Sequence, residues 1–138
     1  MIGKAPSTTT VRNVLIASIV ITLLHYTDNY VSIDEYPQPG WIHGQTIWLA
    51  WSLFTLVGIA GYLMYRDGRP GAAAVYLLVY SLTGLSSLGH YQSGSIDEFT
   101  TRMHVFIWTD GLVGLLVAVM SIWILIARPV PSRAGEAA

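Results

Sequence analysis

Four long apolar runs, separated by short polar segments, constrain this sequence more than any other feature. Each run is close to the roughly 20 residues that a helix needs to cross the hydrocarbon core of a bilayer. Only 11% of the residues are charged, against roughly 25% in an average soluble domain. The pattern predicts an all-α integral membrane protein with a single domain, residues 1–138. Its four spans are expected at residues 14–30, 46–65, 72–89 and 104–127.

The polar segments between the runs are rich in residues that end helices. Residues 31–45 and 90–103 are expected to form two loops, and a tight turn at residues 66–71 lies between them in sequence. A cleavable signal peptide is an alternative reading of the first run, because Lys4 precedes it. No small-x-small cleavage site follows that run, so we expect it to be a retained helix.

Basic residues predict how the spans are oriented. In a four-span arrangement, six of the seven basic residues fall on one side, and Arg102 alone falls on the other. Cytoplasmic segments of membrane proteins carry the excess of Lys and Arg, so both termini and the central turn are expected in the cytoplasm. We expect a multi-pass protein of a prokaryotic cytoplasmic membrane. The six residues are Lys4, Arg12, Arg66, Arg69, Arg128 and Arg133.

This topology favours two helical hairpins packed as an up-down four-helix bundle. Hairpins of the same orientation would be related by an axis along the membrane normal, which is the parallel-repeat arrangement. Gly58 with Gly61, and Gly111 with Gly114, are expected to let helices approach closely.

One phrase occurs twice, once around each expected outer loop. Each copy reads His-Tyr, a short spacer, Ser-Ile-Asp-Glu-aromatic, a second spacer and His, at residues 25–43 and again at residues 90–104. All four histidines of the chain belong to these copies, and the two Asp-Glu pairs of the phrase are four of its eight acidic residues. The phrase predicts an internal repeat, in which each hairpin carries the same outer cap.

The repeat predicts a metal site at the outer face. If the bundle closes with these side chains inward, four imidazoles and four carboxylates approach one axis. Imidazole with carboxylate suits a transition metal such as Zn, Cu, Fe, Ni or Mn, whereas Ca and Mg prefer oxygen ligands. The expected ligands are His25, His43, His90 and His104, with Asp34, Glu35, Asp97 and Glu98.

Three further polar residues are expected to support these ligands. Asp28 and Asn29 follow His25 at the spacings that share one helix face, so Asp28 could hold the second ring nitrogen of His25. Asp110 lies nearly two turns inside the fourth span, where a charged carboxylate is costly. It is expected either to orient a ligand or handle protons beside a histidine, or simply to bond to hydroxyl groups of the third span.

Other readings remain open. The histidines and acids could form a polar network without metal, or cap helices and contact lipid headgroups. Haem held by two histidines, or a quinone, is possible but less favoured than a metal ion. Absence of cysteine excludes thiolate ligands and disulfides, and the scattered basic residues argue against nucleic acid. No residue is assigned a catalytic role, and whether the chain is an enzyme stays open.

In size and topology the chain resembles the emopamil-binding sterol isomerase and sigma-2 receptor group, which has four spans and acidic outer loops. That resemblance implies a polar pocket for a sterol-like ligand and carries over no residues. The leading hypothesis is therefore a small membrane protein that binds a transition metal. The alternatives are a lipid- or sterol-binding bundle, and an accessory subunit of a larger membrane complex. The expected partners are membrane lipid and either further copies of the chain in a homo-oligomer or a larger membrane complex.

Overall fold

The structure, a computed structural model, describes residues 4–127, and within this range it contains helices and no strand. Four helices are long and apolar enough to cross a membrane, as expected for a multi-pass membrane protein. The third continues as a 3-10 helix, and a single 3-10 turn precedes the fourth. The elements are α1 (Thr8–Val31), α2 (Gly44–Arg66), α3 (Pro70–Leu85), η1 (Ser86–Gln92), η2 (Ile96–Glu98) and α4 (Thr101–Ala127).

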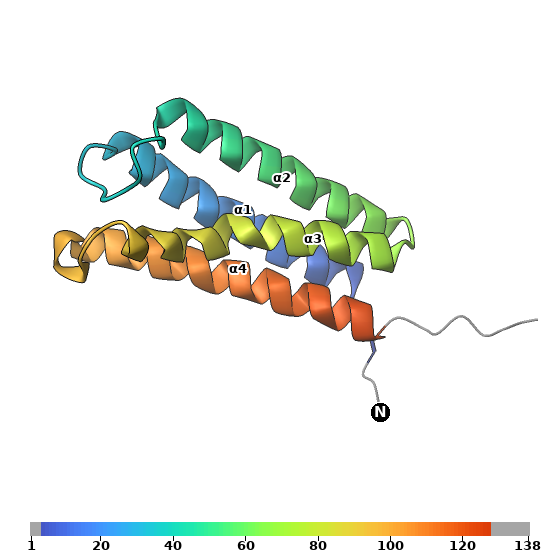
Figure 1. The fold of residues 1–138 in the computed structure, drawn as a ribbon. Helices are drawn as coiled ribbons and strands as arrows, with labels where there is room; N and C mark the ends of the chain where they lie inside the picture. The colour runs from blue at the N-terminus through green and yellow to red at the C-terminus, as the bar shows by residue number, and fades with distance from the viewer. Residues whose placement is uncertain (1–3, 128–138) are drawn as a thin grey trace, which may run out of the picture.

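The helices run side by side in alternating directions (Figure 1). The start of α1, the α2–α3 turn and the end of α4 lie at one end of the bundle, which we call the inner end. The α1–α2 loop and the η1–η2 segment lie at the opposite, outer end. The two segments that carry the repeated phrase therefore share one end of the molecule, as the sequence pattern predicts.

The helix boundaries extend the predicted spans by a few residues where the chain supplies caps. Helix α1 begins at Thr8, because the Ser7 side chain accepts a hydrogen bond from the backbone N–H of Thr10. Residues 8–13, which precede the expected first span, are therefore helical. At the inner turn, Gly68 adopts a left-handed φ of 74°, and Pro70 supplies the first residue of α3.

Helix α3 is shorter than the predicted span, because its last part is wound as a 3-10 helix. Serine hydroxyls accompany the change by donating to backbone carbonyls, since Ser86 bonds to Thr83 and Ser87 bonds to Gly84. Ser87 also lies 3.0 Å from the carbonyl oxygen of Ile107 in α4, so it ties η1 to that helix. His90 is thus carried on a 3-10 segment, whereas its counterpart His25 lies on an α-helix.

Small residues set the spacing of the helices, as expected of helices packed in a membrane. A Cβ atom added at Gly114 would lie 2.6 Å from the backbone nitrogen of Leu85. A Cβ atom at Gly58 or Gly61 would collide with Tyr80 or Leu77 of α3. The predicted close approaches at these three glycines are therefore present. The main apolar core, which includes Leu77, fills the inner part of the bundle.

Candidate functional site: a buried histidine–aspartate pair beside a cavity

A histidine and an aspartate form a pair inside the outer half of the bundle. Nδ1 of His25 on α1 lies 2.7 Å from Oδ2 of Asp110 on α4, and the two side chains are 2% and 0% exposed. Asp110 is nine residues into α4, roughly 13 Å along the axis at 1.5 Å per residue. Among the partners considered for Asp110, the structure thus selects a histidine from the opposite hairpin.

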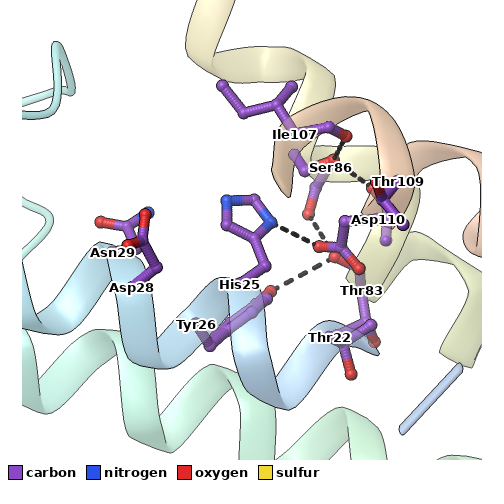
Figure 2. Close-up of polar contacts among 12 residues, drawn as sticks. Thr22, His25, Tyr26, Asp28, Asn29, Thr83, Ser86, Ile107, Thr109 and Asp110 are labelled. Carbon is purple, nitrogen blue, oxygen red and sulfur yellow. Dashed lines mark hydrogen bonds and ion pairs between the residues drawn. The ribbon is translucent and has the colours of Figure 1, made fainter. Parts of the chain in front are cut away.

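This contact leaves the other edge of the imidazole free. Figure 2 shows the Nδ1 edge of His25 turned toward Asp110, with the second nitrogen on the opposite side of the ring. That nitrogen, Nε2, is buried and has no hydrogen-bond partner among residues 4–127. Buried polar atoms nearly always find a partner, so an unpaired Nε2 marks a place where another group can bind.

Aromatic rings surround the imidazole of His25. Phe106 stacks on it with ring centroids 6.4 Å apart, and the ring of Tyr36 lies at the same centroid distance. The ring of His90 approaches within 5.7 Å between centroids. The amide of Asn29 donates to Nε2 of His90 at 3.0 Å. Two of the four histidines therefore meet in this region, and the amide already occupies one nitrogen of His90.

A cavity of about 350 Å³ adjoins the pair. It lies between α1, α2 and η1, and its polar lining includes His25, His90 and Asn29. Trp41, which is 70% exposed, also lines it, so the cavity reaches the molecular surface at the α1–α2 loop. Most of the remaining wall is apolar or aromatic, with Ile42, Ile47, Ala50 and Phe54. An apolar cavity with a few convergent polar groups is the usual form of a small-molecule site.

A second polar cluster closes the outer end above the pair. Arg102 on α4 bonds to Asp28 at 3.1 Å and to Glu35 at 3.1 Å, and its guanidinium also donates to Ser32. The buried Tyr36 hydroxyl donates to Asp28 at 2.6 Å. Burial, and next the hydrogen bond to Asp28, raise the pKa of Tyr36. We call these residues the outer clamp: Asp28, Ser32, Glu35, Tyr36 and Arg102.

The contacts of Asp28 differ from those expected of it. The sequence suggested that Asp28 would hold one ring nitrogen of His25, but Asp110 lies against Nδ1 from across the bundle. Asp28 instead bonds to Tyr36 and Arg102. The reason is geometric, because Asp28 lies in the last turn of α1 and meets α4 near its start at Arg102, while Nδ1 of His25 meets the same helix deeper in the bundle at Asp110.

The other predicted ligands either bond to residues other than His25 and His90 or are exposed. His43 is exposed at the N-cap of α2, where its side chain bonds to Thr46. His104 lies 2.7 Å from the Tyr91 hydroxyl. All four predicted carboxylate ligands are exposed: Asp34, Glu35, Asp97 and Glu98. In η2, Glu98 accepts a hydrogen bond from the backbone N–H of Ser95.

No group of three or more His, Asp or Glu side chains arranged to hold a metal ion occurs within residues 4–127. The two copies of the repeated phrase also differ in use, since His25 pairs with Asp110 and His90 with Asn29. Sequence reasoning missed Tyr36 and Arg102. The signal for Arg102 was available, because it is the one basic residue on the outer side and several acids lie there with it.

A scan against protein-family models, a search of curated proteins and a search of solved structures each found no match to this chain. Any assignment of function therefore depends on the geometry of His25, Asp110 and the adjoining cavity.

Proposed function

We propose that this protein binds a small amphipathic molecule in the cavity between α1, α2 and η1. The polar end of that molecule bonds to Nε2 of His25, and its apolar part lies against Ile47, Ala50 and Phe54. The observation that carries the proposal is the unpartnered, buried Nε2 of a histidine that Asp110 fixes from behind. The cavity volume is at the lower end of the usual range for ligand sites, which suits a headgroup or one ring.

The membrane topology that accompanies this proposal follows from the basic residues. We infer that the inner end, with Lys4, Arg12, Arg66 and Arg69, faces the cytoplasm, and that the cavity opens toward the extracytoplasmic side. The two hairpins would then have the same orientation, as expected for a parallel repeat. A ligand would enter from the outer leaflet or the outer aqueous phase, past Trp41.

A matched pair of substitutions tests the cavity. Ala50→Trp places a large ring in the cavity wall, whereas Leu49→Trp places the same ring at a neighbouring position that is 60% exposed and does not line the cavity. Both proteins are purified without a His tag, and their bound small molecules are extracted and identified by mass spectrometry. We expect one molecule at stoichiometric amount in wild type and Leu49→Trp, and its loss in Ala50→Trp. The same small-molecule content in all three proteins would disprove the proposal.

A transition metal at His25 is the second candidate, and one observation favours it. Metal-bound histidines usually donate their other ring N–H to a carboxylate, which is the relation of His25 to Asp110. His90, whose ring lies beside that of His25, would be the second ligand. It would first have to give up its hydrogen bond from Asn29.

Elemental analysis separates the two candidates. A stoichiometric metal in wild type that disappears in the His25→Ala/His90→Ala double variant would establish the metal site. His43→Ala is the matched control, because His43 is exposed and belongs to no shared cluster. Metal-free wild-type protein that retains an organic molecule leaves the first proposal standing alone.

A further inference from the structure

The protonation of the histidine–aspartate pair determines what kind of group the cavity can bind. Three arrangements of protons are compatible with a hydrogen bond between Nδ1 and Oδ2. A neutral imidazole can donate from Nδ1 to a carboxylate, which leaves Nε2 without a proton and the pair with a net charge of about −1. An imidazolium can donate to the carboxylate, or a protonated Asp110 can donate to Nδ1. In both of these the pair is neutral and Nε2 carries a proton.

The surroundings disfavour the negatively charged arrangement. Both side chains are almost wholly buried, and a net charge buried in a membrane protein is costly without a counter-ion. The groups that face His25 are the rings of Tyr26, Tyr36, His90 and Phe106, none of which is a fixed cation. Arg102, the one basic residue at the outer end within the described range 4–127, is already bonded to Asp28 and Glu35. The neutral pair is therefore the stable one.

We propose that His25 presents an Nε2–H donor to the cavity, and that the ligand is an apolar molecule bearing a carbonyl oxygen. This inference rests on the proposed ligand-binding function and names its substrate class. A protonated alkylamine, which has no acceptor lone pair, or a hydrocarbon would leave the buried donor unsatisfied, which costs affinity. Asn29 adds one acceptor, its unpartnered Oδ1, which suits a hydroxyl group or a water molecule beside the carbonyl.

The shape of the site fits one end of such a molecule. The space of about 350 Å³ holds a substituted ring or an ester group. A long tail must leave through the mouth beside Trp41, toward the outer membrane surface. Two common membrane components share this chemistry, namely quinones with ring carbonyls and glycerolipids with ester carbonyls.

A series of matched probes tests the inference in lipid nanodiscs. The four probes have similar apolar surface: a benzoquinone with a short alkyl tail, a fatty-acid methyl ester, a dialkylbenzene and an alkylamine. We expect the quinone or the ester to bind wild type about ten-fold more tightly than the dialkylbenzene or the amine, since one buried hydrogen bond has about that effect. Tighter binding of the quinone indicates a quinone-like ligand, and tighter binding of the ester indicates a glycerolipid.

Two variants of His25 and one infrared measurement test whether Nε2–H is the group that binds the carbonyl oxygen. His25→Phe should reduce carbonyl binding to the level of the hydrocarbon, and His25→Gln, which retains an N–H donor, should restore part of it. Because His25→Phe leaves Asp110 unpaired and could unfold, the infrared carbonyl stretch of a labelled quinone is also measured on wild type. Hydrogen bonding from Nε2–H shifts this band to lower frequency.

Equal binding of all four probes, or tightest binding of the amine, would overturn the inference. If the native molecule is lost in Ala50→Trp while no probe shows a carbonyl preference, the inference fails and the ligand-binding function stands. If wild type retains no molecule and binds no probe, both fail.

Discussion

At the scale of single residues, the site is defined by which imidazole nitrogens have hydrogen-bond partners. Asp110 occupies Nδ1 of His25, and Asn29 occupies Nε2 of His90. Nε2 of His25, a residue that lines the cavity, has no partner within residues 4–127. A buried pair of this kind is costly to break, because removing one member leaves the other without a partner in an apolar environment. The pair therefore contributes both to holding α1 against α4 and to presenting a polar atom to the cavity.

The coupling between the two side chains can be measured directly. We expect Asp110→Ala to lower the free energy of unfolding in detergent by about 1–3 kcal/mol, because it leaves Nδ1 of His25 unsatisfied. A double-mutant cycle with His25→Ala should give a coupling energy of about 0.5–3 kcal/mol. Asp97→Ala is the control, since Asp97 is exposed, and it should change stability by less than about 0.5 kcal/mol. Additive effects of the two substitutions would show that the pair is not formed.

Tyr36 gives a prediction for alkaline pH. Burial and the hydrogen bond to Asp28 raise the pKa of Tyr36, so the folded protein keeps this proton at a pH where the unfolded chain has lost it. Stability should therefore fall as pH rises above about 10, the ordinary tyrosine pKa. We expect a shallower decline for Tyr36→Phe than for wild type in unfolding experiments from pH 8 upward. Identical slopes in the two proteins would contradict the buried hydrogen bond.

At the scale of the elements, the fold was largely predictable and the site only in part. Four apolar runs and the polar turns between them were enough to locate the helices, because a membrane span needs a minimum length of apolar sequence. The 3-10 winding of η1 was not predictable, since it depends on Ser87 bonding to Ile107 across the bundle. The sequence also could not show that Asp110, rather than Asp28, bonds to His25, because this contact too joins two facing helices. Local spacing favours neighbours on one helix and carries no information about the facing one.

The crossing of α3 and α4 provides a test at this scale. Gly114→Ala should destabilise the protein by about 1–3 kcal/mol, because the added Cβ would lie 2.6 Å from the Leu85 backbone and the helices must separate. Gly40→Ala is the matched control, since a Cβ at Gly40 meets nothing within 4 Å. Thermal unfolding in detergent distinguishes them. Equal midpoints for the two variants would show that the helices do not approach as closely as the structure describes.

At the scale of the whole molecule, the candidate site lies at one end of the four-helix bundle. The repeated phrase lies at one end of the bundle and the basic turn lies at the other (Figure 1). The cavity lies at the end with the repeat, where Trp41 and His90 line it. The repeat predicted that polar residues would gather at this end. It also predicted that all four histidines would act together at one site. In the structure His43 bonds to Thr46 and His104 bonds to Tyr91, so the symmetric four-histidine site stays a prediction.

Cysteine labelling tests the topology, because the natural chain contains no cysteine. Asp97→Cys, at the outer end, should react with a membrane-impermeant maleimide in intact cells. Asp67→Cys, in the exposed α2–α3 turn, should react only after the membrane is permeabilised. The reverse pattern would place the cavity on the cytoplasmic side and contradict the proposed route of ligand entry.

The protonation of His25 tests the central claim most directly. Nitrogen-15 NMR of histidine-labelled protein in lipid bilayers reports which ring nitrogen carries a proton. The account predicts a protonated Nε2 at neutral pH, with a signal that moves when the short-tailed benzoquinone is added to wild type and stays unchanged in Ala50→Trp. An unprotonated Nε2, or a signal that does not respond to the probe in wild type, would contradict it.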